Sequence, residues 1–361
     1  MEPSIFATMD YGLGFNRPTP SSLSSSNQLS PFVINTIEIS QLCLVTVTVP
    51  FYLFLLFFMI QGQLRKVDEL ATPFFKLCIS TAVIDLSTLF ANYFGVMFPK
   101  FGLFFSFYTW LDGVYAHTYF YIAWSTGICQ AMSVSVLATN RLSAMIFPGE
   151  YRKMWSSYRL WIAISIQFIP GMLISFLTFF NQTQLIITED HKIVPKFQDK
   201  QFTTLFFGIG GFFLFANCLY LIIAYCYLFI ILHKRNKKMM PQITQNKSKE
   251  KFRKREQRLF IMCSIIVAVQ LLILLFFIVK TLGWFQFNLD EFYVLYNALS
   301  DVFACINPYL LWIFSDSLRK YVLFKLGIRQ SASPNTTLAT VGFDRATNTN
   351  TNLGNARNYT F

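Results

Sequence analysis

The sequence Ala138-Thr139-Asn140-Arg141-Leu142, followed by Phe147-Pro148-Gly149-Glu150-Tyr151-Arg152-Lys153-Met154-Trp155, marks the point where a long apolar segment meets charge. Pro148 disfavours helical backbone at Phe147 and cannot continue a helix, so we expect a helix to end there. The aromatic and basic residues that follow are typical of a membrane–water interface. The pattern predicts that Arg141 lies where a membrane-spanning helix leaves the bilayer. An arginine that only marks the membrane edge is the alternative.

The composition is that of a membrane protein. The chain has 361 residues, of which 54% are hydrophobic, 13% are charged and 42 are phenylalanine. Soluble domains carry about 25% charged residues, so this composition argues against a water-soluble fold. The net charge of +12 is concentrated in short loops between apolar runs. We therefore interpret it as a determinant of topology and not as a surface that binds nucleic acid.

Seven apolar runs are long enough to cross a bilayer, which takes about 20 residues. The sequence therefore predicts an all-α integral membrane protein, a seven-transmembrane-helix bundle with spans near residues 40–60, 73–98, 116–142, 158–180, 203–232, 259–282 and 291–314. The expected organisation is a flexible extracellular tail (1–38), the membrane domain (39–314), a short amphipathic surface helix (315–328) and a disordered cytosolic tail (329–361).

Basic residues predict the orientation. With the N-terminus outside and the C-terminus in the cytosol, 24 of the 30 Lys and Arg residues lie on the inner side. This asymmetry follows the positive-inside rule. Lys254, Arg255 and Arg258 extend the sixth span on that side, where they can meet an anionic inner leaflet or an acidic partner.

Ionisable and amide groups inside the spans predict a polar core. Asp85 lies mid-membrane, and Asp301 precedes the Asn307-Pro308 pair in the seventh span. A charged group at such a depth costs about 2.5–3.5 kcal/mol, so it needs a partner or a function. One hypothesis is a core that exchanges water or an ion as the helices shift. Static hydrogen bonds between helices are the alternative.

Other site chemistry is limited. The three histidines and seven cysteines fall in no metal-binding or disulfide pattern, so we predict no cofactor, no metal and no enzyme activity. Asn181 begins a glycosylation sequon on the expected outer side. A ligand pocket is expected between the third, fifth, sixth and seventh spans, where polar and aromatic residues reach mid to outer depth: Tyr119, Tyr121, Trp124, Asn217, Gln270, Tyr296 and Asn297.

The chain resembles the nematode serpentine chemoreceptors, with class gamma (Srg) and its relatives the nearest match. The resemblance covers about residues 35–328. It is carried by Asn140-Arg141-Leu142, by Phe147-Pro148-x-x-Tyr151-x-x-x-Trp155, by Asp85, and by Asn307-Pro308-Tyr309-Leu310-Leu311.

The resemblance implies a G-protein-coupled chemosensory receptor of the plasma membrane, sensory cilia included, that binds an external small molecule or peptide and activates a heterotrimeric G protein. The residues that would serve coupling are Asn140, Arg141, Pro148, Tyr151, Lys254, Arg255 and Arg258. A seven-helix ligand-gated channel or a transporter is the alternative.

Asn140 departs from the rhodopsin-like pattern, which has an acid before the arginine. An amide cannot hold Arg141 by charge. We therefore expect a loosely restrained arginine and some ligand-independent activity.

Overall fold

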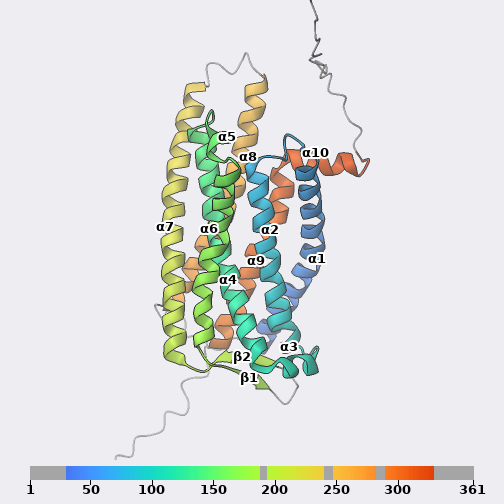
Figure 1. Ribbon diagram of the computed structural model, residues 1–361, viewed down its shortest axis with the longest axis vertical. Helices are drawn as coiled ribbons and strands as arrows, with labels where there is room; N and C mark the ends of the chain where they lie inside the picture. The colour runs from blue at the N-terminus through green and yellow to red at the C-terminus, as the bar shows by residue number, and fades with distance from the viewer. Residues whose placement is uncertain (1–29, 188–192, 240–246, 282–288, 329–361) are drawn as a thin grey trace, which may run out of the picture.

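The structure is a computed structural model, and it describes residues 30–187, 193–239, 247–281 and 289–328. Most of the expected N-terminal tail and all of the expected tail at 329–361 lie outside the described residues. The described chain forms a bundle of long helices (Figure 1). Its elements are α1 (Pro31–Leu64), α2 (Pro73–Asn92), η1 (Tyr93–Met97), α3 (Phe98–Lys100), α4 (Phe105–Ile146), α5 (Tyr151–Met154), α6 (Ser157–Ser175), η2 (Phe176–Phe180), β1 (Thr183–Ile187), β2 (Ile193–Phe197), α7 (Lys200–Met239), α8 (Lys247–Thr281), α9 (Leu289–Phe314) and α10 (Asp316–Lys325).

The bundle has the number of spans that the sequence predicts. Within the described chain, six helices are long and apolar enough to cross a membrane, or up to seven if α9 and α10 are taken as one bent span. The two parts of that pair meet at 81°. The side chains that face away from the bundle are largely apolar and exposed, as a lipid-facing surface requires.

The first helix begins earlier than expected. Ser30 precedes α1, and its hydroxyl accepts a hydrogen bond from the Val33 amide at 3.3 Å. Pro31 occupies the first turn, where a missing N–H is harmless. Residues 31–38 are therefore helical, although the sequence suggested that the tail continues to residue 38.

The end of the bundle opposite α10 is built from irregular helix and a hairpin (Figure 1). A π-helical turn, η1, extends α2. Its Phe94 and Gly95 carbonyls accept hydrogen bonds from the hydroxyls of Tyr108 and Tyr115, each at 2.5 Å. Such turns leave backbone carbonyls available to other donors. The antiparallel pair β1–β2 packs beside this region, although the sequence predicted only helix.

Helix α4, which contains the expected third span, has an internal break. Asp112 has a positive φ (φ 42°, ψ −126°) and a non-helical backbone within α4. The expected third span began at Ala116, just after this break. The helix from there to Ile146 runs through the centre of the bundle and contacts α2, α6, α7 and α8.

The last helix, α10, lies across one end of the bundle in the segment 315–328 (Figure 1). Its N-cap is Ser315, whose hydroxyl accepts from the Leu318 amide at 3.4 Å. Gly327 adopts a φ of +71° just beyond the helix, a conformation that glycine tolerates. Tyr321 donates to Gln61 of α1 at 3.0 Å and so fixes α10 to the first helix.

The contact between α4 and α6 depends on one glycine. A Cβ at Gly171 would lie 2.4 Å from the Cys129 sulfur and 2.5 Å from the Ser125 carbonyl oxygen. The two helices approach closely because no side chain separates them.

We therefore predict that Gly171→Ala lowers the free energy of unfolding by about 1–3 kcal/mol, the usual effect of overpacking. Gly208→Ala is the matched control, since a Cβ there meets nothing within 4 Å. Unfolding of the two purified variants, followed by helical circular dichroism, measures the difference. Equal stability of the two variants would contradict this packing.

Candidate functional site

Asp85 is the centre of a buried polar network. Its side chain is fully buried on α2. The Tyr52 hydroxyl from α1 and the Asn307 amide from α9 each donate to Oδ2 at 2.7 Å. The Gln130 amide from α4 donates to Oδ1 at 2.9 Å. A single carboxyl group thus links four helices, and its oxygens have the donors that a buried acid needs.

Asp301 forms a second network. It is 1% exposed on α9 and accepts from Gln41 of α1 at 2.9 Å and from Asn92 of α2 at 2.7 Å. The sequence suggested one polar core for Asp85, Asp301 and Asn307. The structure brings Asn307 to Asp85 and gives Asp301 its own amide donors. Pro308 lies within α9, next to Asn307.

Arg141 is held against α2. Its side chain is 6% exposed, and its guanidinium carbon lies 3.5 Å from the centre of the Phe74 ring. A cation over an aromatic face away from water contributes about 2 kcal/mol or more. The expectation of a loosely restrained Arg141 is therefore wrong for this conformation. An aromatic ring takes the place of the missing acid.

The residues after Arg141 are tied back to the same helix end. Asn140 donates to the Tyr151 hydroxyl at 3.1 Å, and the indole of Trp155 donates to the Ser143 hydroxyl at 2.7 Å. Pro148 lies in the turn between α4 and α5. The spacing of Asn140, Tyr151 and Trp155 therefore has a structural cause, since it closes a short loop on the end of α4.

The basic extension of α8 is described in part. Arg258 forms an ion pair with Asp316, which also pairs with Arg319 of α10. All three side chains are partly exposed, so each pair contributes about 0–1 kcal/mol. The side chains of Lys254 and Arg255 lie outside the described residues. Both residues belong to α8.

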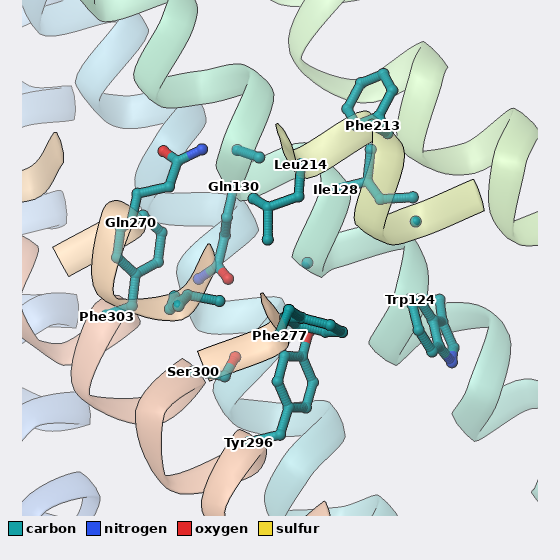
Figure 2. Close-up of a pocket in the computed structure, with 14 residues that line it drawn as sticks. Trp124, Ile128, Gln130, Phe213, Leu214, Gln270, Phe277, Tyr296, Ser300 and Phe303 are labelled. Atoms are coloured by element: carbon teal, nitrogen blue, oxygen red, sulfur yellow. The ribbon is translucent and has the colours of Figure 1, made fainter. Parts of the chain in front are cut away.

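A pocket lies between α4, α7, α8 and α9 (Figure 2). Its volume is about 60 Å³. Residues of all four helices line it: Trp124, Gly127, Ile128, Gln130, Ala131, Gly210, Phe213, Leu214, Gln270, Ile273, Phe277, Tyr296, Ser300 and Phe303. This is the set of helices between which the sequence placed a ligand pocket, and Trp124, Gln270 and Tyr296 are among the residues it suggested.

The other suggested ligand residues have different surroundings. Asn217 is used in packing, since its oxygen accepts from Ser135 and its nitrogen donates to the Ala131 carbonyl at 2.9 Å. The Tyr119 ring covers Gly95, and the Tyr121 ring packs on Phe179 at 5.2 Å. Asn297 is half-buried on α9 and does not line the pocket described here.

Asn181 is not presented for modification. Its side chain is 3% exposed, and its amide nitrogen donates to the Thr203 hydroxyl at 3.2 Å. This nitrogen is the atom that would carry a glycan. Attachment would require the contact between the end of η2 and α7 to break, so the folded arrangement argues against the predicted glycosylation.

Sequence reasoning missed Gln130, Tyr52, Gln41 and Asn92. Gln130 has the greatest consequence because it lines the pocket and donates to Asp85. A signal was available, since a glutamine within an apolar span requires a partner. The sequence does not reveal that its partner is Asp85, because the pairing depends on how the helices are rotated against one another.

The fold and these features define the class of protein. The structure of squid rhodopsin is similar, with a TM-score of 0.60 and 17% identity over 84% of this chain and 88% of that chain. At this identity the likeness shows the fold alone, a seven-transmembrane-helix bundle. The chain is therefore a multi-pass membrane protein with the fold of squid rhodopsin.

The family follows from the sequence comparison. The family model "Serpentine type 7TM GPCR chemoreceptor Srv" matches residues 41–328, and the chain belongs to this family. Serpentine receptor class V-1 of Caenorhabditis elegans is 32% identical over 94 residues. That match covers 23% of this chain and only 27% of the relative.

The expected class gamma is thus corrected to Srv, another class of serpentine chemoreceptors. The broader resemblance is confirmed. The residues that carried it have structural roles in this chain, at the end of α4 and around Asp85.

We predict that Tyr52→Phe lowers the free energy of unfolding by about 1 kcal/mol, because it removes a donor from a buried carboxyl group. Tyr93→Phe is the matched control. The Tyr93 hydroxyl is also buried, and it has no hydrogen-bond partner among the described residues. Unfolding of both variants in a denaturing detergent titration measures the difference. If the Tyr93 variant loses as much stability as the Tyr52 variant, the Asp85 contact does not have this role.

Proposed function

We propose that this chain is a chemosensory receptor of the plasma membrane that binds an external ligand in the α4–α7–α8–α9 pocket and activates a heterotrimeric G protein. Membership of the Srv family supports this proposal. In the proposed orientation the N-terminus lies outside, and α5 and α10 lie at the cytosolic end of the bundle (Figure 1). The positions of 24 of the 30 basic residues support it.

The observation that carries the proposal is the position of Gln130. This residue lines the pocket and donates to Asp85, which in turn binds Asn307 beside Pro308. Arg141 lies further along the same helix, about 16 Å away at 1.5 Å per residue. Helix α4 therefore joins the pocket wall at Gln130 to Arg141, and a shift of this helix in response to a ligand would reach both residues.

The proposed mechanism follows from these contacts. A ligand that separates α8 and α9 from α4 alters the donors around Asp85 and shifts α9 at its proline. The cytosolic ends of α8 and α4 then move apart, and Arg141 leaves the Phe74 ring. Its rigid fork of five donors can meet the C-terminal carbonyls of an inserted G-protein helix. A ligand drives this change only by the difference in its affinity for the two states.

A ligand-gated channel or a transporter is the other candidate function. A seven-helix channel of inverted topology would place the N-terminus inside, against the charge distribution. An epitope tag at the N-terminus, stained on intact cells, separates the receptor from such an inverted channel. We expect staining without permeabilisation, and staining only after permeabilisation would contradict the receptor topology.

We predict that Arg141→Ala lowers receptor-dependent nucleotide exchange on the G protein by at least about tenfold, or roughly 1.4 kcal/mol of coupling. Arg159→Ala is the matched control, because Arg159 is an exposed arginine at the start of α6 near the same end of the bundle. The measurement uses purified receptor in nanodiscs with a panel of heterotrimeric G proteins. Full exchange by the Arg141 variant would show that this arginine serves topology only.

A further inference from the structure

The pocket between α4, α7, α8 and α9 is uncharged. Among the described residues that line it, none is Asp, Glu, Lys, Arg or His. Its polar groups are the amides of Gln130 and Gln270, the hydroxyls of Tyr296 and Ser300, and the indole N–H of Trp124 (Figure 2). The rest of its wall is aromatic and aliphatic. A charged ligand would leave water for this site without an opposite charge, which is strongly unfavourable.

Gln270 is the polar group of this pocket that the fold satisfies least. Its side chain is 1% exposed on α8, neither its amide nitrogen nor its amide oxygen makes a hydrogen bond of ordinary length among the described residues, and the polar group beside it is the weakly bonding Cys218 thiol. Gln130 differs, because its nitrogen is already bound to Asp85. Buried polar groups in folded proteins are nearly always paired, so an amide on a cavity wall with so weak a partner indicates that a stronger one binds there.

We propose that the ligand is a small, uncharged molecule with one carbonyl or hydroxyl oxygen, and that Gln270 binds this oxygen. The inference rests on the proposed function only in taking this pocket as the ligand site. A carbonyl oxygen accepts from the Gln270 nitrogen, and a hydroxyl can also donate to its oxygen. A hydrocarbon leaves the amide unpaired and is therefore bound less well.

The size of the cavity narrows the class further. Its volume of about 60 Å³ is well below the roughly 150 Å³ of a protein cavity that holds benzene. A ligand of a few heavy atoms fits with small side-chain movements, whereas a peptide does not fit. The external ligands that fit this cavity are therefore small neutral molecules with a short apolar body.

The experiment compares four probes of similar size and different charge: 2-butanone, 2-butanol, 2-aminobutane and butanoate. Binding to the purified full-length receptor in nanodiscs is measured by ligand-observed NMR, with protein-free nanodiscs as the blank. We expect the ketone and the alcohol to bind at least about tenfold more tightly than the amine and the carboxylate. Equal or tighter binding of either charged probe would overturn the proposal.

Substitutions assign the effect to one side chain. Gln270→Leu keeps much of the volume and removes the amide, and we expect it to weaken 2-butanone about tenfold. Because the amide has only the weakly bonding Cys218 thiol beside it, this variant should fold about as well as the natural chain. Gln167→Leu is the matched control, since Gln167 is a fully buried glutamine on α6 away from the pocket. Unchanged binding in the Gln270 variant would overturn the role of Gln270.

A variant that gains affinity for an amine provides an independent test of the role of Gln270. Gln270→Glu places a carboxyl group on the pocket wall, and we expect it to admit 2-aminobutane. No change in amine binding would count against the proposal. Nucleotide exchange measured on the same samples separates the two proposals. If the neutral probes bind without causing nucleotide exchange, the proposed G-protein coupling is contradicted and the ligand class is supported. If only the charged probes cause exchange, the ligand class is contradicted and the G-protein coupling is supported.

Discussion

The need to satisfy one buried carboxyl group organises the membrane part of this protein. Asp85 has no access to water, so its oxygens must find donors within the bundle. Tyr52, Gln130 and Asn307 supply them from three other helices. Apolar packing alone specifies helix rotation weakly in a lipid environment, where the surroundings are as apolar as the helices. The hydrogen bonds to Asp85 fix which faces of α1, α2, α4 and α9 meet.

The same constraint connects the parts of the proposed receptor. Gln130 cannot move without changing the donors on Asp85, and it lies on the wall of the pocket. The helix that carries Gln130 also carries Arg141 near its C-terminal end, and Arg141 rests on the Phe74 ring of α2. Asp85 and Phe74 both belong to α2, so α2 contacts α4 at Gln130 and again at Arg141.

Much of this arrangement could be predicted from the sequence. Hydropathy identified the seven spans, and the proline at 148 marked the end of α4. The choice of Trp124, Gln270 and Tyr296 for the pocket depended on depth along each span. Asn217 and Tyr119 do not line this pocket, because depth does not give rotation and both side chains turn toward a neighbouring helix. The hairpin β1–β2 and the ring beneath Arg141 depend on contacts distant in sequence, which periodicity cannot reveal.

The most direct test of this account is a double-mutant cycle between Gln130 and Asp85. The free energy of unfolding is measured for the natural chain, for Gln130→Leu, for Asp85→Leu and for the double variant. If the Gln130 amide is bound to the Asp85 carboxyl group, the two substitutions should be coupled by about 1 kcal/mol. Strictly additive effects, within about 0.3 kcal/mol, would contradict the claim that these residues form the link between the pocket and the polar core.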